Sequence, residues 1–204
     1  MNDGFISAIL KAMSPIAVGP HDALVVVDPQ VDFLPGGALP VAEGNRIFGP
    51  INAVMPRFNR VYATRDWHPP NHASFRAAGG PWPDHCVAGT RGAAFSELLD
   101  QTRIDRIVDK GVEPNTEGYS GFDGTDLAQD LRAHGITRIF VCGLATDYCV
   151  RATALDARSL GFEVVVLTDA VAAVDVNPGD EERALEDMRK AGVQLAESSD
   201  ILSE

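Results

Sequence analysis

Arg138-Ile-Phe-Val-Cys-Gly-Leu-Ala-Thr-Asp-Tyr-Cys-Val-Arg151 is the stretch that decides the fold. It begins with an apolar run rich in β-branched and aromatic side chains, which predicts a buried strand that stops at Gly143. Past Thr146 the pattern becomes helical, so we expect Cys149 in the first turn of a helix. The unpaired N–H groups and the dipole of such a turn favour a thiolate and could hold an oxyanion. A lone cysteine is more often inert, so its chemistry depends on the rest of the chain.

Predicted strands and predicted helices alternate along the rest of the chain. Apolar runs that predict further strands lie at 23–27, 60–64, 106–109, 162–167 and 193–196. Helical spacing lies at 45–58, which two prolines are expected to break, at 125–134 and at 181–191. This alternation predicts an α/β fold: a single-domain, doubly wound, mostly parallel sheet in a Rossmann-like three-layer arrangement. The carboxyl ends of the strands then form one edge, where ligands bind.

The composition narrows the class of partner. The chain has 204 residues and a formal net charge of −12, with no basic stretch, so we expect no nucleic-acid partner. No apolar stretch reaches the length of a membrane span, and we expect no membrane partner. Three cysteines without a Cys-x-x-Cys pair argue against a disulfide framework and for a reducing cytoplasm. Cys86 and Cys142 are expected to be small buried side chains.

Residues 1–20 are expected to form an appendage to a single domain that spans 21–204. Apolar residues at positions 5, 6, 9, 10 and 13 have helical spacing, and a linker containing Pro and Gly follows them. Such a helix could pack on the domain or on another subunit. The appendage is therefore assigned no function, and the oligomeric state, including a homo-oligomer, is left open.

Three chemically useful side chains fall where predicted strands end. Asp28 follows the first strand, Lys110 the third and Cys149 the fourth. A carboxylate, an ammonium group and a thiol at one sheet edge supply a base, a charge stabiliser and a nucleophile. Each residue alone would be ordinary, since a lysine after a strand is usually solvated. Their coincidence at one edge predicts an active site that needs no histidine for catalysis.

The segment after the second strand predicts a metal site. Asp66 and His68 are two residues apart in an extended stretch, so their side chains share a face, and His85 lies further along the same long loop. Oxygen and nitrogen ligands in an irregular loop suit a metal ion with open coordination positions. The alternative is that these side chains only hydrogen-bond the loop, and spacing alone does not decide between the two.

Longer motifs surround these residues. They are Val27-Asp-Pro-Gln-Val-Asp-Phe33 with Gly36-Gly37, Asp66-Trp-His-Pro-Pro-Asn-His72, Trp82-Pro-Asp-His85-Cys-Val87, Lys110-Gly111, Tyr119-Ser-Gly-Phe122 and Gly143-Leu-Ala-Thr-Asp-Tyr-Cys-Val-Arg151. With these motifs assembled, the sequence closely resembles the nicotinamidase/pyrazinamidase family, within the isochorismatase-like cysteine hydrolases. The set is specific, although each motif alone would be weak.

The resemblance implies two groups of site residues. The catalytic triad would be Asp28, Lys110 and Cys149. The ligands of one divalent metal ion, zinc first with iron or manganese as alternatives, would be Asp66, His68 and His85. His72 is left open as a ligand, because family members differ in whether a further loop residue completes the coordination.

The resemblance also implies a substrate pocket and a reaction. Phe33, Trp82 and Tyr119 would wall an aromatic ring. A cis peptide bond before Ala145 would aim the backbone N–H groups of Ala145 and Cys149 at the substrate oxygen. The implied reaction is hydrolysis of a small aromatic carboxamide, nicotinamide and also pyrazinamide, to the acid and ammonia. It would proceed through a thioester on Cys149 and serve NAD salvage.

Three other assignments compete with this one. Another amide or ureide hydrolase of the same superfamily would keep the triad, but such relatives generally lack the metal loop. Isochorismatase itself is disfavoured, because its reaction needs no thiol nucleophile such as Cys149. A non-catalytic metal-binding or thiol-redox module would require the triad to be accidental, and a redox thiol more often has a resolving partner nearby. The preference among flat aromatic amides and the metal's identity are left open.

Overall fold

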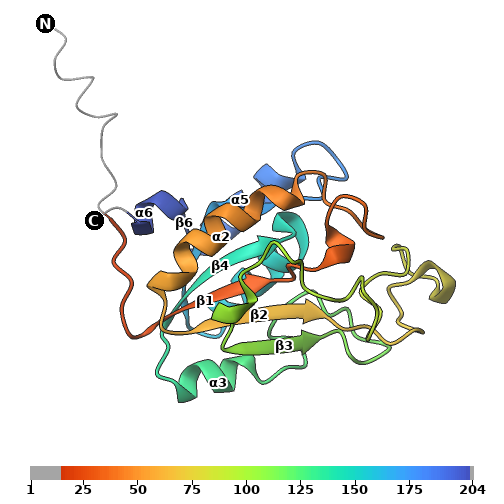
Figure 1. Ribbon diagram of the computed structural model, residues 1–204, viewed down its shortest axis with the longest axis horizontal. Helices are drawn as coiled ribbons and strands as arrows, with labels where there is room; N and C mark the ends of the chain where they lie inside the picture. Colours follow the sequence, from red (N-terminus) through yellow and green to blue (C-terminus); the bar gives the residue numbers. More distant parts are fainter. Residues whose placement is uncertain (1–14, 203–204) are drawn as a thin grey trace, which may run out of the picture.

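Six parallel strands form the central sheet in the order β3-β2-β1-β4-β5-β6 (Figure 1). The computed structural model that shows them describes residues 15–202. The strands are β1 Asp22–Val27, β2 Val61–Asp66, β3 Arg106–Lys110, β4 Arg138–Leu144, β5 Glu163–Ala172 and β6 Gln194–Ala196. Every pairing between these strands is parallel, so the predicted doubly wound sheet is confirmed.

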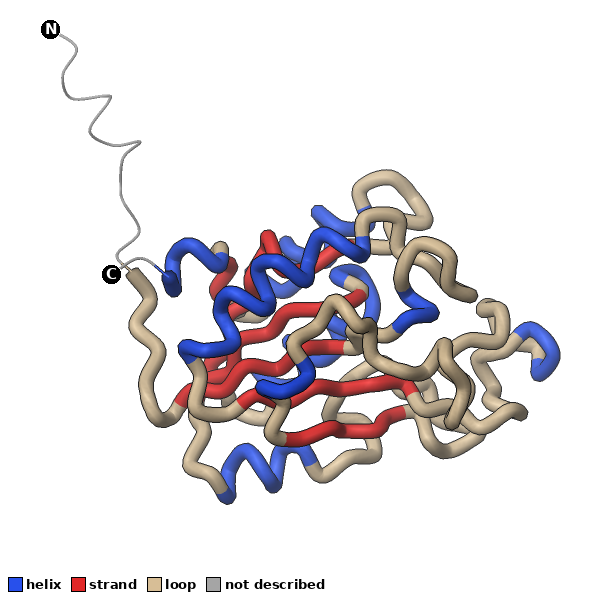
Figure 2. The backbone as a smooth tube through the Cα atoms, viewed as in Figure 1, coloured by secondary structure: helices blue, strands red, loops and turns tan. Residues whose placement is uncertain are grey.

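Helices cover both faces of this sheet (Figure 2). One face carries α2 Phe48–Val54 and α6 Ser198–Leu202, and the other carries α3 Leu127–Ala133, α4 Arg151–Ser159 and α5 Asp180–Lys190. In β1, Leu24 and Val26 join the hydrophobic cluster under α2, whereas Ala23, Val25 and Val27 join the opposite cluster. A strand buried on both faces has an uninterrupted apolar sequence, which is the pattern at 23–27.

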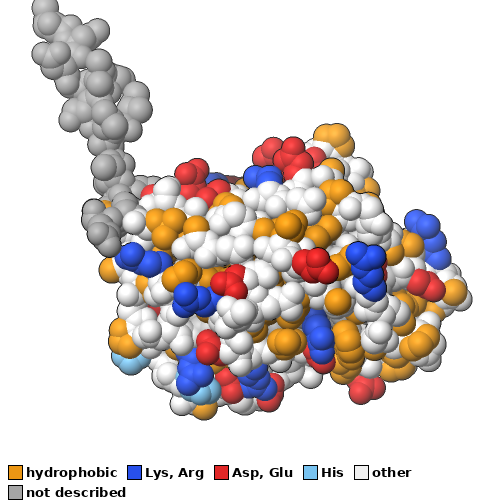
Figure 3. Space-filling model, viewed as in Figure 1, with side chains coloured by type: hydrophobic (Ala, Val, Ile, Leu, Met, Phe, Trp, Pro, Cys, Tyr) orange, Lys and Arg blue, Asp and Glu red, His pale blue; other side chains and the backbone are white. Residues whose placement is uncertain are grey.

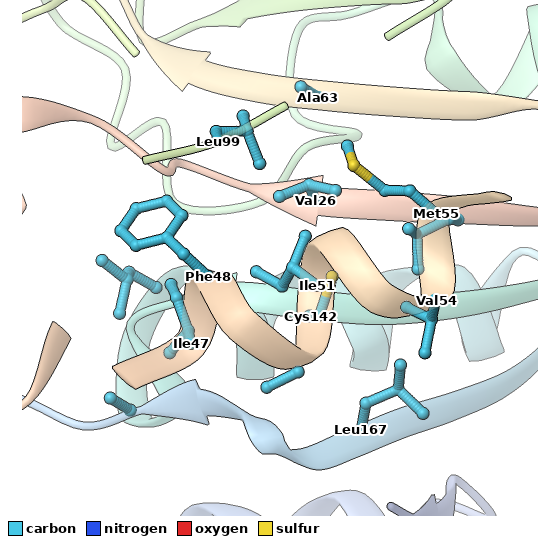
Figure 4. Close-up of a cluster of buried hydrophobic side chains, with 14 of the residues drawn as sticks. Val26, Ile47, Phe48, Ile51, Val54, Met55, Ala63, Leu99, Cys142 and Leu167 are labelled. Atoms are coloured by element: carbon cyan, nitrogen blue, oxygen red, sulfur yellow. The ribbon is translucent and has the colours of Figure 1, made fainter. Parts of the chain in front are cut away.

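The helix α2 is the middle of the helix expected at 45–58. Short 3-10 turns at Gly44–Ile47 and Met55–Arg57 flank it, and the second turn contains Pro56, which cannot donate a helical hydrogen bond. The buried side chains of α2 pack over Val26 of β1 and Leu167 of β5 (Figure 4). The expected break in this segment is therefore present.

Strands β2 and β3 run further than the sequence pattern predicts. Asp66 and Lys110 are their last residues and pair with each other in register, rather than following the strands. The sequence pattern does not assign these two residues to the strands, because carboxylates and ammonium groups are rarely buried unless they are paired. The sequence pattern also does not predict the helix α6 or the continuation of β5 to Ala172.

The described part of the N-terminal segment packs on the domain. The side chains of Ile16 and Val18 contact the core, and the backbone N–H of Ile16 donates to the carbonyl of Asp200 at 2.8 Å. The apolar helix expected at 5–13 lies outside the described residues. The predicted boundary at residue 20 therefore stays a prediction.

The surface mixes charges of both signs. On the face shown in Figure 3, Lys and Arg side chains lie among Asp and Glu side chains. Some of these charges are paired, as in the contact of 2.5 Å between Arg65 Nε and Asp109 Oδ1. Within residues 15–202, none of the helices has both the length and the apolar character that crossing a membrane requires.

Candidate active site

Asp28 leaves β1 at the point where the strand order reverses, between β1 and β4. Its φ of 46° lies in the left-handed region, where Asp is among the few residues tolerated. Thr64 fixes it: the Thr64 hydroxyl donates to Asp28 Oδ1 at 2.6 Å, and the Asp28 N–H donates to the Thr64 carbonyl at 3.2 Å. Burial raises the pKa of this carboxyl to about 6, although Lys110 opposes the shift. Asp28 can therefore act as a base near neutral pH.

Lys110 is buried at the end of β3 with its ammonium group between two carboxylates. Its Nζ lies 2.5 Å from Asp66 Oδ1 and 2.8 Å from Asp28 Oδ2. The same atom donates to the Gly118 carbonyl at 2.7 Å and lies 3.5 Å from Cys149 Sγ. Burial opposes the charge, but the two carboxylates raise the pKa of Lys110 well above its ordinary value. The residue is thus a permanent cation at the centre of the site.

Cys149 lies in a π-helical turn, Thr146–Val150, that leads into α4. The peptide bond before Ala145, at the start of this turn, is cis, as the family resemblance implies. The strand β4 approaches β1 closely here. A Cβ at Gly143, whose φ is +111°, would lie 2.0 Å from the Val27 carbonyl oxygen, so only glycine fits. The turn thereby brings the thiol to the carboxyl edge of the sheet.

The thiol of Cys149 has a higher pKa than its place in the first turn suggests. Burial raises the pKa well above the ordinary value, the Asp28 and Asp66 carboxylates raise it further, and Lys110 only partly opposes them. Burial beside two carboxylates therefore opposes the helix dipole, which by itself would favour a thiolate. A base is needed, and a carboxylate oxygen of Asp28 lies within 4.8 Å of Sγ.

Asp66, His68 and His85 bring a carboxylate oxygen and two ring nitrogens within 4.8 Å of one another. The Nδ1 atom of His68 lies 2.9 Å from the Gly111 carbonyl, and that of His85 lies 2.7 Å from the Pro83 carbonyl. A ring N–H held by a carbonyl leaves the other ring nitrogen as a neutral donor, which is the usual arrangement behind a metal-binding histidine. The donor set of this metal-ligand cluster therefore fits one divalent ion.

Protonation states and packing also suit a cation at this cluster. Burial lowers the pKa of His85, which keeps its ring neutral. Burial would raise the pKa of Asp66, but the charge of Lys110 and hydrogen bonds from His68 and Lys110 lower it overall. Gly111, with a φ of +60°, lets His68 approach, because a Cβ there would lie 2.5 Å from the His68 ring.

His72 lies beside the metal-ligand cluster. Its ring stacks on that of His68, with centroids 4.0 Å apart, and its Nδ1 lies 2.7 Å from the Ser74 hydroxyl. Burial lowers the pKa of His72 to about 4, and His68 adds to the shift. In the described part of the chain, the atoms clustered here come from the other three side chains. A role for His72 as a ligand stays a prediction.

A cavity of about 40 Å³ lies between the nucleophile Cys149 and the metal-ligand cluster and is lined by residues of both. Its walls include Cys149, Asp66 and His85, so a molecule inside it meets both the thiol and the metal-ligand cluster. The aromatic side chains expected as its walls all line it; they are Phe33, Trp82 and Tyr119. Ala145, expected to offer its backbone N–H, lines it as well.

Comparison with known proteins gives the family. The isochorismatase domain model matches residues 22–200. The chain belongs to the isochorismatase domain family. Within that family, the nicotinamidase of Escherichia coli K12 is 39% identical over 201 residues, which covers 86% of this chain and 94% of the relative. The similarity places the chain in the nicotinamidase/pyrazinamidase group.

Two solved structures of this group are similar throughout. The pyrazinamidase of Pyrococcus horikoshii in complex with zinc is 53% identical, with a TM-score of 0.81 and coverage of 87% of this chain and 99% of that one. PnC1 from L. infantum in complex with nicotinate is 43% identical, with a TM-score of 0.88 and coverage of 93% and 100%. The family fold therefore extends over nearly the whole described chain.

Some residues that line the cavity are not predicted from the family motifs. Leu39, Tyr148 and Val174 line it and are absent from the prediction made from sequence. The Tyr148 ring meets Trp82 edge-on, with centroids 5.2 Å apart. Val174 follows the carboxyl end of β5, so the rule that sites lie beyond strand ends, applied to that strand too, would find it. Leu39 carries no comparable signal.

Proposed function

We propose that this chain is a nicotinamidase, which hydrolyses nicotinamide to nicotinate and ammonia and also accepts pyrazinamide. One observation carries the proposal: a single cavity is lined by the Cys149 thiol, by Asp66 and His85 of the metal-ligand cluster, and by aromatic side chains. A flat ring that bears both a ring nitrogen and a carboxamide matches all three. The relatives named nicotinamidase and pyrazinamidase, and the one bound to nicotinate, support this substrate class.

The biological setting belongs to the same proposal. Conversion of nicotinamide to nicotinate serves NAD salvage, and we place it in the cytoplasm. The cysteines Cys86, Cys142 and Cys149 are all free, which supports a reducing compartment. The two that take no part in the chemistry are buried, as predicted.

Acylation needs a base, a charge stabiliser and an oxyanion site. Asp28 removes the proton from the Cys149 thiol, and the thiolate attacks the carboxamide carbon. Lys110 remains charged and stabilises the thiolate as it forms, across the 3.5 Å between Nζ and Sγ. The backbone N–H groups of Ala145 and Cys149 receive the oxyanion. The proton held by Asp28 passes to the departing nitrogen, ammonia leaves, and a thioester on Cys149 remains.

Deacylation reverses the proton movements. Asp28, again a carboxylate, accepts a proton from the water that attacks the thioester carbon. The tetrahedral intermediate collapses, the carbon–sulfur bond breaks, and the acid leaves as nicotinate after its remaining proton passes to solvent. The proton on Asp28 returns to the Cys149 sulfur, which restores the resting thiol. A carboxyl whose pKa is about 6 can both take and give a proton near neutral pH, as this cycle requires.

The residues that would hold a metal ion are Asp66, His68 and His85. This mixture of ligands suits zinc first, with iron or manganese as alternatives, and the zinc-bound relative supports zinc. A bound ion would supply a Lewis-acid site for the ring nitrogen of the substrate. Asp66 can face both ways, because Oδ1 contacts Lys110 at 2.5 Å while Oδ2 lies 3.5 Å from His68 Nε2.

The test is ammonia release from nicotinamide by the purified full-length protein, with and without a chelator. Cys149→Ala should abolish release, and chelation or Asp66→Ala should weaken it. Cys142→Ala is the matched control, because Cys142 is equally buried but belongs to the hydrophobic cluster under α2. Appreciable release by Cys149→Ala would refute the thioester mechanism, and no release by the metal-loaded wild type would refute the substrate.

The alternative is another amide or ureide hydrolase of the same family. The metal-ligand cluster at Asp66, His68 and His85 argues against it, because a ureido group offers no pyridine-type nitrogen to a bound ion. Turnover of a ureido compound, together with inert nicotinamide, would favour this alternative. Metal binding without turnover of any carboxamide would favour a non-catalytic module.

A further inference from the structure

Three aromatic side chains form the aromatic half of the lining of the substrate cavity. Trp82, Tyr119 and Tyr148 line the cavity and are all partly exposed. They form one packed unit, because Trp82 Nε1 donates to the Tyr119 hydroxyl at 3.1 Å and the Tyr148 ring lies against both, with centroids 5.2 and 5.8 Å away. Aromatic rings of this kind pack on the faces of a flat substrate ring.

The aliphatic half of the lining consists of Leu39, from the loop before α2, and Val174, just beyond β5. Both side chains are partly buried and also pack against the core. The cavity between the two halves holds about 40 Å³, room for about three water molecules, so a substrate ring would touch every wall.

Carboxylates of the site's own segments hold the aliphatic half in place. Asp147, two residues before Cys149, accepts hydrogen bonds from the backbone N–H groups of Val174 at 3.0 Å and Asp175 at 2.9 Å. Hydrogen bonds to an ionised acceptor are about twice as strong as neutral ones. The position of Val174 is therefore fixed relative to the nucleophile.

Leu39 is held in the same way from the side of the metal-ligand cluster. Asp32 accepts a hydrogen bond from the Ala38 N–H at 3.2 Å through Oδ1 and from the Cys86 N–H at 2.7 Å through Oδ2. Cys86 directly follows His85 in the chain. The two aliphatic side chains are thus anchored to the two ends of the reacting site, one to the thiol and one to the cluster.

The inference rests on the proposed function, because that function sets the orientation of the substrate ring in the cavity. The ring nitrogen faces Asp66 and His85, and the carbon that bears the carboxamide lies beside Cys149. One ring carbon, C2, separates these two positions, so it faces Asp66, whose carboxylate lies within 4.8 Å both of the thiol and of the histidine nitrogens. The carbon opposite to it, C5, then points away from Asp66, toward the partly exposed side chains of the lining, which include Leu39 and Val174.

We propose that Val174, together with Leu39, limits the size of the substituent that the site accepts at C5 of the pyridine ring. A wall that is anchored and apolar discriminates by volume, and one extra methylene in such a pocket changes kcat/KM about 10- to 200-fold. The wild type therefore prefers nicotinamide to 5-methylnicotinamide by a factor in this range. Val174 and Leu39 are specificity-determining residues and take no part in bond making.

The experiment measures ammonia release from both amides and compares their kcat/KM ratio among variants of the metal-loaded protein. Val174→Ala removes two methyl groups from the wall and narrows the ratio at least about tenfold. Val174→Ile extends the wall and widens the ratio. Val176→Ala is the matched control, because Val176 lies in the same loop, 57% exposed and away from the cavity, and it leaves the ratio unchanged.

Val174→Thr separates shape from stability. It keeps the branched shape of valine, so the ratio stays close to that of the wild type even if the melting temperature falls. A ratio that is unchanged in both Val174→Ala and Val174→Ile, with nicotinamide turned over, would overturn this inference alone. A Val174→Thr ratio equal to that of Val174→Ala would overturn the role of size. Wild type inert toward nicotinamide would overturn the proposed function and this inference together.

Discussion

Lys110→Met tests whether one buried cation organises the whole site. Methionine is close to lysine in shape, so the substitution removes the charge while leaving most of the packing intact. The ammonium group that is lost contacts Asp28 Oδ2 at 2.8 Å and Asp66 Oδ1 at 2.5 Å, with both carboxylates buried. The variant therefore leaves two buried carboxylates within 4.8 Å of each other with no cation between them.

The expected loss of stability follows from this burial. Removing one partner of a buried ion pair costs about 3–5 kcal/mol, because the remaining charge is left uncompensated. Asp28 can relieve part of the cost by taking up a proton, since its pKa is already raised to about 6. We therefore expect the lower end, about 3 kcal/mol. For a chain of this size the melting temperature should then fall by about 6–12 °C.

The pH dependence of this loss has a definite sign. Without Lys110, the Asp28 and Asp66 carboxyls bind protons more tightly in the folded than in the unfolded chain. The loss is therefore absent below about pH 4, the ordinary pKa of Asp, and grows as the pH rises through the raised pKa values of the folded chain. The melting temperature of Lys110→Met should lie closer to that of the wild type at pH 5 than at pH 8.

The assay is thermal unfolding followed by circular dichroism at both pH values, together with ammonia release at pH 7.5. Activity should fall at least about 100-fold, because Asp28 then holds its proton and cannot serve as a base. Lys190→Met is the control: its side chain is 69% exposed, and the change should cost less than about 0.5 kcal/mol. Equal melting temperatures for Lys110→Met and the control at pH 8 would refute the reasoning.

Three further predictions concern the base, the thiol and the metal-ligand cluster. The kcat/KM of the wild type should fall as the pH drops through about 6, where Asp28 takes up a proton, and a flat profile from about pH 5 to 8 would contradict its role as base. Iodoacetamide at pH 7 should modify Cys149 slowly, as followed by mass spectrometry, because burial raises the pKa of the thiol; rapid alkylation would indicate a resting thiolate. After dialysis against zinc, His85→Ala should lose the bound ion and His72→Ala should keep it, measured by atomic absorption; loss from both would make His72 a ligand.

The sequence predicts the position of reactive side chains that lie just beyond the ends of predicted strands. Asp28 and Cys149 could be placed at one edge because parallel strands end together, and the apolar run at 23–27 needed only the rule for doubly covered strands. The sequence could not establish the protonation of the Cys149 thiol, because the pKa of a thiol depends on which carboxylates the fold buries beside it. Leu39 and Val174 escaped notice because aliphatic side chains in loops resemble ordinary core residues until the cavity is known.

Asp66 belongs to the metal-ligand cluster and also contacts the triad, and the pairing of β2 with β3 places it there. One of its oxygens contacts Lys110 and the other faces His68, so loss of Asp66 would disturb the triad and the metal-ligand cluster together. In the part of the chain that the structure describes, His85 enters only the second of these clusters, so His85→Ala isolates the contribution of the metal. The shared carboxylate also requires Asp66 to lie opposite Lys110, as it does. A slip of one residue between the strands would turn one of the two side chains to the other face of the sheet and dissolve both clusters at once.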